Sequence, residues 1–248
     1  MAYKSNFIAI AIGGAGKLKL KLSELDINLV VDGDSTFKGT NNCGDINNRF
    51  ANELAANIFP QTKSLTFTNV AVSGQTTKNM LRGDFTDASL EVISGRFNVL
   101  VAGESINAIL NYDYKGDADG AATGQINFDD LKLYDEKMRA AGYDMIIRVT
   151  SYYPRKINSS GYNRAEWTSE VRARQKDYYD LVETANETSV NKTWDALVQL
   201  RESPTLGGPE EQLIDVSRFE DSVHLLCLGQ KDMADYVYET GILPLFQE

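Results

Sequence analysis

Residues 27–35, Ile-Asn-Leu-Val-Val-Asp-Gly-Asp-Ser, decide how this chain is expected to fold. The short apolar run 27–31 predicts a buried strand, and Asp-Gly-Asp at 32–34 predicts a turn where that strand ends. Glycine permits a tight turn, and a serine directly after a buried strand can project its hydroxyl from the edge of a sheet. Ser35 is therefore a candidate nucleophile. The alternative is a structural serine that caps a helix or stabilises a turn.

The rest of the chain alternates between short apolar runs and stretches with helical spacing. Strands are predicted at 27–31, 65–72, 97–101, 145–150 and 212–216, and helices at 46–58, 128–141, 164–185, 192–201 and 231–240. This alternation predicts an α/β fold, a three-layer α/β/α sandwich with a five-stranded parallel sheet. Ligands of such sheets bind beyond the carboxyl ends of the strands. Ser35, Gly74 and Asn107 all follow closely on predicted strand ends.

Two segments are expected along the chain, an N-terminal extension over 1–26 and a single domain over 27–248. Lysine and leucine alternate over 17–22, which predicts a short β appendage with one face in water. Lys4 and the apolar run 7–12 also have the outline of a secretion signal, and we favour the appendage.

Composition excludes several classes of partner. With 25 basic and 35 acidic residues the net charge is −10, which argues against nucleic acid. No apolar run approaches the roughly 20 residues of a membrane span. The two cysteines, Cys43 and Cys227, are too few for a disulfide framework, so we expect free thiols, with a single bridge as the alternative.

His224 is the only histidine, which excludes a multi-histidine metal site. One histidine can still act as a general base if a partner fixes its tautomer. Asp221, three residues earlier, can supply that carboxylate across a tight loop, although an isolated Asp-x-x-His pair is more often structural. Ser35, His224 and Asp221 are thus the candidate catalytic residues, and we expect neither cofactor nor metal.

Three stretches resemble the signature blocks of the SGNH (GDSL-like) hydrolases. The stretch 32–35 resembles the Gly-Asp-Ser block, 69–77 the second block, and 221–225 the last block. They occur in the correct order over about 190 residues. The resemblance implies the flavodoxin-like SGNH fold and a Ser-His-Asp triad, with the backbone of Gly74 as an oxyanion donor.

The third block departs from the family pattern of glycine, any residue, asparagine and aspartate. The preferred alignment places Asn107 at the asparagine, with Ser105 at the glycine and Ala108 at the aspartate. A rival alignment anchored on Gly103 places Ser105 at the asparagine. The implied oxyanion hole is therefore Ser35, Gly74 and Asn107, with Ser105 as the alternative to Asn107.

The resemblance implies a serine esterase that removes small acyl groups, expected to be acetyl, from carbohydrate. The substrate would be a small-molecule or polysaccharide ester. A lipase or thioesterase, or a catalytically silent carbohydrate-binding or structural module, stays as the alternative. The spacing over 164–224 also resembles hydrolase modules of phage tail proteins, which favours a secreted or virion-associated protein in a homo-oligomer or larger assembly.

Overall fold

The computed structural model centres on a parallel sheet. It describes residues 20–39, 49–103, 106–110, 123–154, 156, 168–208, 213, 215–221 and 224–246. The sheet has five strands in the order β2-β1-β3-β4-β5, and each neighbouring pair is parallel. The strands are β1 (Asp26–Gly33), β2 (Ser64–Asn69), β3 (Phe97–Gly103), β4 (Met145–Thr150) and β5 (Ala196–Gln199). The expected five-stranded parallel α/β architecture is confirmed.

The strand order reverses at the carboxyl ends of β1 and β3. From β1 the chain moves outward to β2 on one side, and it then returns to form β3 on the other side. In such doubly wound sheets, ligands bind where the strand order reverses. Gly33 and Gly103 are paired at this point, one at the end of each strand.

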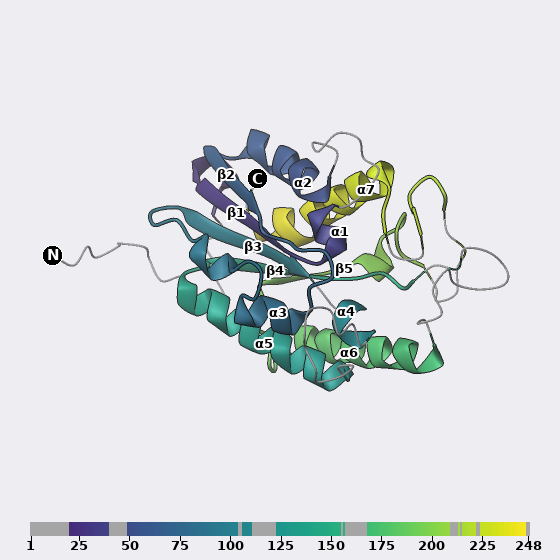
Figure 1. Cartoon of the computed structure of the whole chain (residues 1–248). Helices are drawn as coiled ribbons and strands as arrows, with labels where there is room; N and C mark the ends of the chain where they lie inside the picture. Colours follow the sequence, from purple (N-terminus) through teal and green to yellow (C-terminus); the bar gives the residue numbers. More distant parts are fainter. Residues whose placement is uncertain are drawn as a thin grey trace.

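Helices cover both faces of the sheet (Figure 1). On one side lie α1, α2 and α7, and on the other lie α3, α4, α5 and α6. Their bounds are α1 (Ser35–Lys38), α2 (Phe50–Ile58), α3 (Thr77–Arg82), α4 (Ile106–Ile109), α5 (Gly124–Ala141), α6 (Ser169–Thr188) and α7 (Cys227–Val237). No helix in the described part of the chain is both long and apolar enough to cross a membrane.

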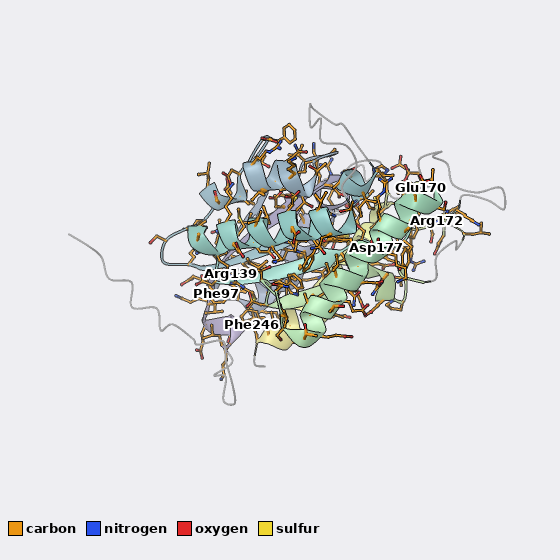
Figure 2. All side chains as sticks on the ribbon, turned by 90° about the horizontal axis from the view of Figure 1, so that it is seen from below. Phe97, Arg139, Glu170, Arg172, Asp177 and Phe246 are labelled. Carbon is orange, nitrogen blue, oxygen red and sulfur yellow. The ribbon has the colours of Figure 1, made fainter. Side chains whose placement is uncertain are left out.

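The local sequence explains the two longest helices. Thr123 and Thr168 cap the amino ends of α5 and α6 by accepting backbone N–H bonds, as threonine does at helix starts. Gly142 ends α5 with a positive φ of 114°, which glycine adopts readily. Figure 2 shows α5 and α6 side by side over the sheet, with Arg139 at one end and Glu170 at the other.

The two faces of the sheet differ in character. On β1, β3 and β4, the buried side chains that face α2 and α7 are apolar: Ile27, Leu29, Val31, Val99, Val101, Met145, Ile147 and Val149. The face toward α5 and α6 also has apolar residues, but buried polar side chains interrupt them: Asn28, Asp32, Asn98, Arg148 and Thr150. Alternation of side chains along each strand separates these two sets.

The fifth strand is not where the sequence predicted it. The helix expected at 192–201 is wrong, because Ala196–Gln199 forms β5 and Leu200–Glu202 follows as a 3-10 turn. Of the strand expected at 212–216, residues 212 and 214 lie outside the described residues, and the described remainder is not among the five strands of the sheet. Leu213 forms an isolated parallel bridge with Lys156, and Val216 is 75% exposed. Periodicity cannot separate a short apolar strand from a helix, so pairing with β4 decides the outcome.

The N-terminal extension is described only from residue 20. Residues 17–19 of the expected β appendage lie outside the described residues. Leu22–Glu24 forms a short 3-10 helix, and Leu22 is buried in the apolar cluster on the side of the sheet that α2 and α7 cover.

Candidate active site

Ser35 lies at the amino end of α1, directly after β1. Asp34 caps this short helix, with its carboxylate accepting the backbone N–H of Thr36 at 2.8 Å. A Cβ at Gly33 would lie 2.4 Å from the carbonyl oxygen of Gly103, so only glycine allows this close approach of β1 to β3. Ser35 is half-buried at the carboxyl end of β1.

Asp221 and His224 lie in a tight loop before α7. Glu220 N–H donates to the carbonyl of His224 at 2.8 Å, which closes the loop. One carboxylate oxygen of Asp221 accepts the backbone N–H of His224 at 2.8 Å. The other oxygen lies 2.8 Å from His224 Nδ1. Asp221 therefore holds both the backbone and the ring of the histidine.

Arg218 anchors this loop to the rest of the protein. Its Nε donates to Asp232 on α7 at 2.7 Å, and its guanidinium also binds Asp215 at 2.6 Å. Gly229 at the start of α7 has no room for a Cβ, which would lie 2.4 Å from the Arg218 carbonyl. The loop therefore sits directly against the first turn of α7.

The structure brings together the three residues predicted for the triad. Ser35 Oγ lies 3.1 Å from His224 Nε2, although the two residues are 189 positions apart. An ionised Asp221 can only accept, so Nδ1 carries the ring proton and Nε2 is left to accept the Ser35 hydroxyl. The arrangement can withdraw a proton from Ser35.

The segments that carry Gly74 and Asn107 meet at the same end of the sheet. Val72 N–H donates to the Gly33 carbonyl at 2.9 Å, so the segment before Gly74 continues alongside β1. Gly74 has a φ of 79°, a left-handed conformation that favours glycine. The Asn107 side-chain amide donates to the Gln75 carbonyl at 3.0 Å. Ser105, the alternative to Asn107, lies outside the described residues.

Three further polar residues, Asp32, Gln75 and Tyr134, which were not predicted from the sequence as site residues, form hydrogen bonds at this end of the sheet. Asp32, fully buried within β1, accepts from Gln75 Nε2 at 2.9 Å and from the Tyr134 hydroxyl at 2.6 Å. Burial raises the pKa of Asp32 to about 6 despite these donors. A charged residue directly after an apolar strand was the available signal, but its partners lie far away in the sequence.

A second buried carboxylate lies beside the serine. Burial raises the pKa of Asp34 to about 6, while the cap to Thr36 and the nearby His224 act in the opposite direction. Among the described residues, no group of three or more histidine, cysteine, aspartate or glutamate side chains could hold a metal ion.

Cys227, the first residue of α7, is disulfide-bonded. The expected free thiol at this position is therefore wrong. Cys43, the other cysteine of the sequence, lies outside the described residues.

Several solved structures have the same fold. An acetylxylan esterase from Geobacillus stearothermophilus is 14% identical, with 92% of this chain and 100% of that chain covered at a TM-score of 0.63. A member of the lipolytic G-D-S-L family from Veillonella parvula is 15% identical, with 88% and 98% covered at 0.58. An α/β hydrolase enzyme from the metagenome of Lake Arreo, Spain, is 17% identical, with 86% and 94% covered at 0.59.

Comparison by sequence adds nothing to these matches. No family model matches the chain, and no curated protein matches it. The structural likenesses show that the chain has the α/β/α fold of the SGNH hydrolases.

Proposed function

We propose that this chain, which has the fold of the G-D-S-L lipolytic proteins, is a serine esterase. Ser35 is the nucleophile, His224 the general base and Asp221 the group that orients the base. The observation that carries this proposal is the continuous contact from Ser35 Oγ to His224 Nε2 at 3.1 Å and from His224 Nδ1 to Asp221 at 2.8 Å.

The reaction is a two-step acyl transfer. His224 Nε2 takes the proton of the Ser35 hydroxyl as Oγ attacks the ester carbonyl, and Asp221 stabilises the resulting imidazolium. His224 then returns the proton to the departing alcohol, and an acyl-serine remains. Water attacks this acyl-serine with His224 again as base, which releases the acid and restores Ser35.

Three groups are proposed to stabilise the oxyanion: the backbone N–H of Ser35, the backbone N–H of Gly74 and the side-chain amide of Asn107. The Asn107 amide has two hydrogens, so one can bind the Gln75 carbonyl while the other reaches the oxyanion. Loss of one such donor typically costs about 2.7–4 kcal/mol of transition-state stabilisation.

The proposed substrate is a small acyl ester, with acetyl on carbohydrate as the first choice. Support comes from the match over 92% of this chain to an acetylxylan esterase. Tyr152, an aromatic residue just after β4, gives no support for sugar binding. It is 1% exposed, and its ring packs edge-on against Phe219 with the ring centres 5.2 Å apart. A lipase or thioesterase is the alternative, and it predicts faster turnover of longer acyl chains.

Hydrolysis of p-nitrophenyl esters from acetate to octanoate tests the proposal. We expect the wild type to cleave acetate fastest and Ser35→Ala to lose activity by about 10⁴-fold or more. Ser169→Ala is the matched control, because Ser169 is also the first residue of a helix but lies exposed on α6. If wild-type protein cleaves none of the esters, the chain is not an esterase.

Other outcomes address the finer assignments. Activity that survives in Ser35→Ala would exclude Ser35 as the nucleophile. Rates that rise with chain length would favour the lipase or thioesterase, whereas acetate release from acetylated xylan would support the carbohydrate substrate.

A further inference from the structure

Gln75 contacts each segment that carries a proposed oxyanion donor. It directly follows Gly74, and its own backbone N–H closes the turn by donating to the Val72 carbonyl at 3.2 Å. Its side-chain Nε2 donates to the Gly33 carbonyl at 2.5 Å, two residues before Ser35. Its carbonyl accepts the Asn107 amide at 3.0 Å. One residue thus connects the end of β1 and helix α4 to the turn that carries Gly74.

Asp32 fixes the direction in which the Gln75 side chain points. The carboxylate accepts from Gln75 Nε2 at 2.9 Å, from the Gly33 backbone N–H at 2.8 Å and from the Tyr134 hydroxyl at 2.6 Å. Since both partners of the Gln75 head group, Asp32 and the Gly33 carbonyl, are acceptors, only the amide nitrogen can face them. The side chain therefore has one orientation.

This arrangement is not what packing alone would favour. Gln75 is 0% exposed, and its Oε1 has no hydrogen-bond partner among the described residues. A buried polar atom without a partner destabilises the fold, and so does the buried carboxylate of Asp32. An apolar side chain at position 75 would remove the unpaired Oε1, but it would also take a donor away from Asp32 and could not bind the Gly33 carbonyl.

We propose that Gln75 is a positioning residue for the oxyanion site: with Asp32 and Tyr134 behind it, it sets the relative positions of the Ser35 turn, Gly74 and the Asn107 amide. The inference rests on the esterase activity proposed above. Oxyanion donors bind charge that develops only in the transition state. Displacing them therefore lowers kcat and leaves KM nearly unchanged.

The test compares kcat and KM on p-nitrophenyl acetate for the wild type, Gln75→Met and Asn28→Leu. Methionine keeps the length of glutamine and removes both hydrogen bonds from Nε2. Asn28→Leu is the matched control, because Asn28 is equally buried and faces the same layer from the opposite end of β1. We expect kcat of Gln75→Met to fall about 10–100-fold with KM within about twofold. Asn28→Leu should keep its kcat.

The outcomes separate this inference from the proposed function. An active wild type with an unchanged kcat in Gln75→Met, or with an equal loss in Asn28→Leu, overturns the positioning role alone. A wild type that hydrolyses no ester overturns the esterase and the positioning role together. If Gln75→Met does not fold, Tyr134→Phe tests the positioning role instead, because it removes only the hydroxyl that donates to Asp32. Here a fall in kcat of several-fold at constant KM is expected, and no change would exclude the role.

Discussion

The two faces of the sheet support different halves of the candidate site. On the face under α2 and α7, apolar strand residues pack against Phe37 and Phe50, whose rings meet edge-on at 5.4 Å. This layer holds α1 with Ser35 and the loop with His224. On the opposite face, β1 and β4 carry buried charges that contact α5, and this layer holds the Gly74 turn and Asn107.

The difference teaches how stability and site geometry are divided in this protein. Burial of apolar area stabilises a fold without fixing directions closely, whereas buried hydrogen bonds fix directions and add little net stability. The proposed triad therefore lies against the apolar core on the side of α2 and α7, while the proposed oxyanion donors are held by a polar network on the opposite side. We expect substitutions in the two layers to have different consequences.

The largest expected effect is at Asp221, on the side of the sheet that α2 and α7 cover. Asp221→Asn keeps an oxygen for the His224 backbone N–H but can no longer hold the proton on Nδ1. We expect kcat to fall about 10³–10⁴-fold with the fold intact. Since His224 is the only histidine, its ring nitrogens are directly assignable by NMR, and a shift of the tautomer should accompany the loss. A normal tautomer in the variant would contradict this role of Asp221.

An intermediate effect is expected at the buried pair of Arg148 and Asp135, which are 1% and 0% exposed. Arg148→Met leaves the Asp135 carboxylate buried without its charged partner, so the free energy of unfolding should fall by about 3–5 kcal/mol. Arg148→Met/Asp135→Leu should recover much of this loss. Urea unfolding measures both.

Leu29→Ala tests the apolar face of the sheet under α2 and α7, for comparison with the ion pair on the opposite face. It should cost about 2–5 kcal/mol through the cavity it leaves, and no second substitution should be expected to restore it. If Arg148→Met/Asp135→Leu is no more stable than Arg148→Met, the buried charge of Asp135 is not the cause of the loss, and the two faces do not differ in the way expected.

The smallest expected effect is a pH dependence at Asp32. Its folded pKa is about 6 and its ordinary value is 3.8, so between these values the folded protein keeps a proton that the unfolded chain has lost. Stability from this group therefore falls as pH rises from about 4 to about 6. Relative to the wild type, Asp32→Asn should gain about 1–3 kcal/mol over that window, measured by urea unfolding at each pH. A constant difference across the window would show that Asp32 does not titrate there.

Much of the fold could be predicted because it is encoded locally. The strand predicted at 145–150 has those bounds in the structure, and the helices expected at 128–141 and 231–240 are present with shifted ends. Residues 192–201 were wrongly predicted as a helix, since a four-residue strand is defined by its partner β4 rather than by its own pattern. The expected phage-tail assembly and the secreted or virion-associated location rest on the sequence alone and stay predictions.

The sequence by itself placed the first four strands of the sheet in their chain order, and it identified Ser35, Asp221 and His224 as candidates. It could do so because a strand end, a glycine turn and a single histidine are local features. Only the tertiary structure decided that Ser35 and His224 meet at 3.1 Å, and that Gln75, Asp32 and Tyr134 form one network. Those contacts join residues that are 43 to 189 positions apart in the sequence. The pairing of parallel strands and the packing of helices on them bring these residues to one end of the sheet.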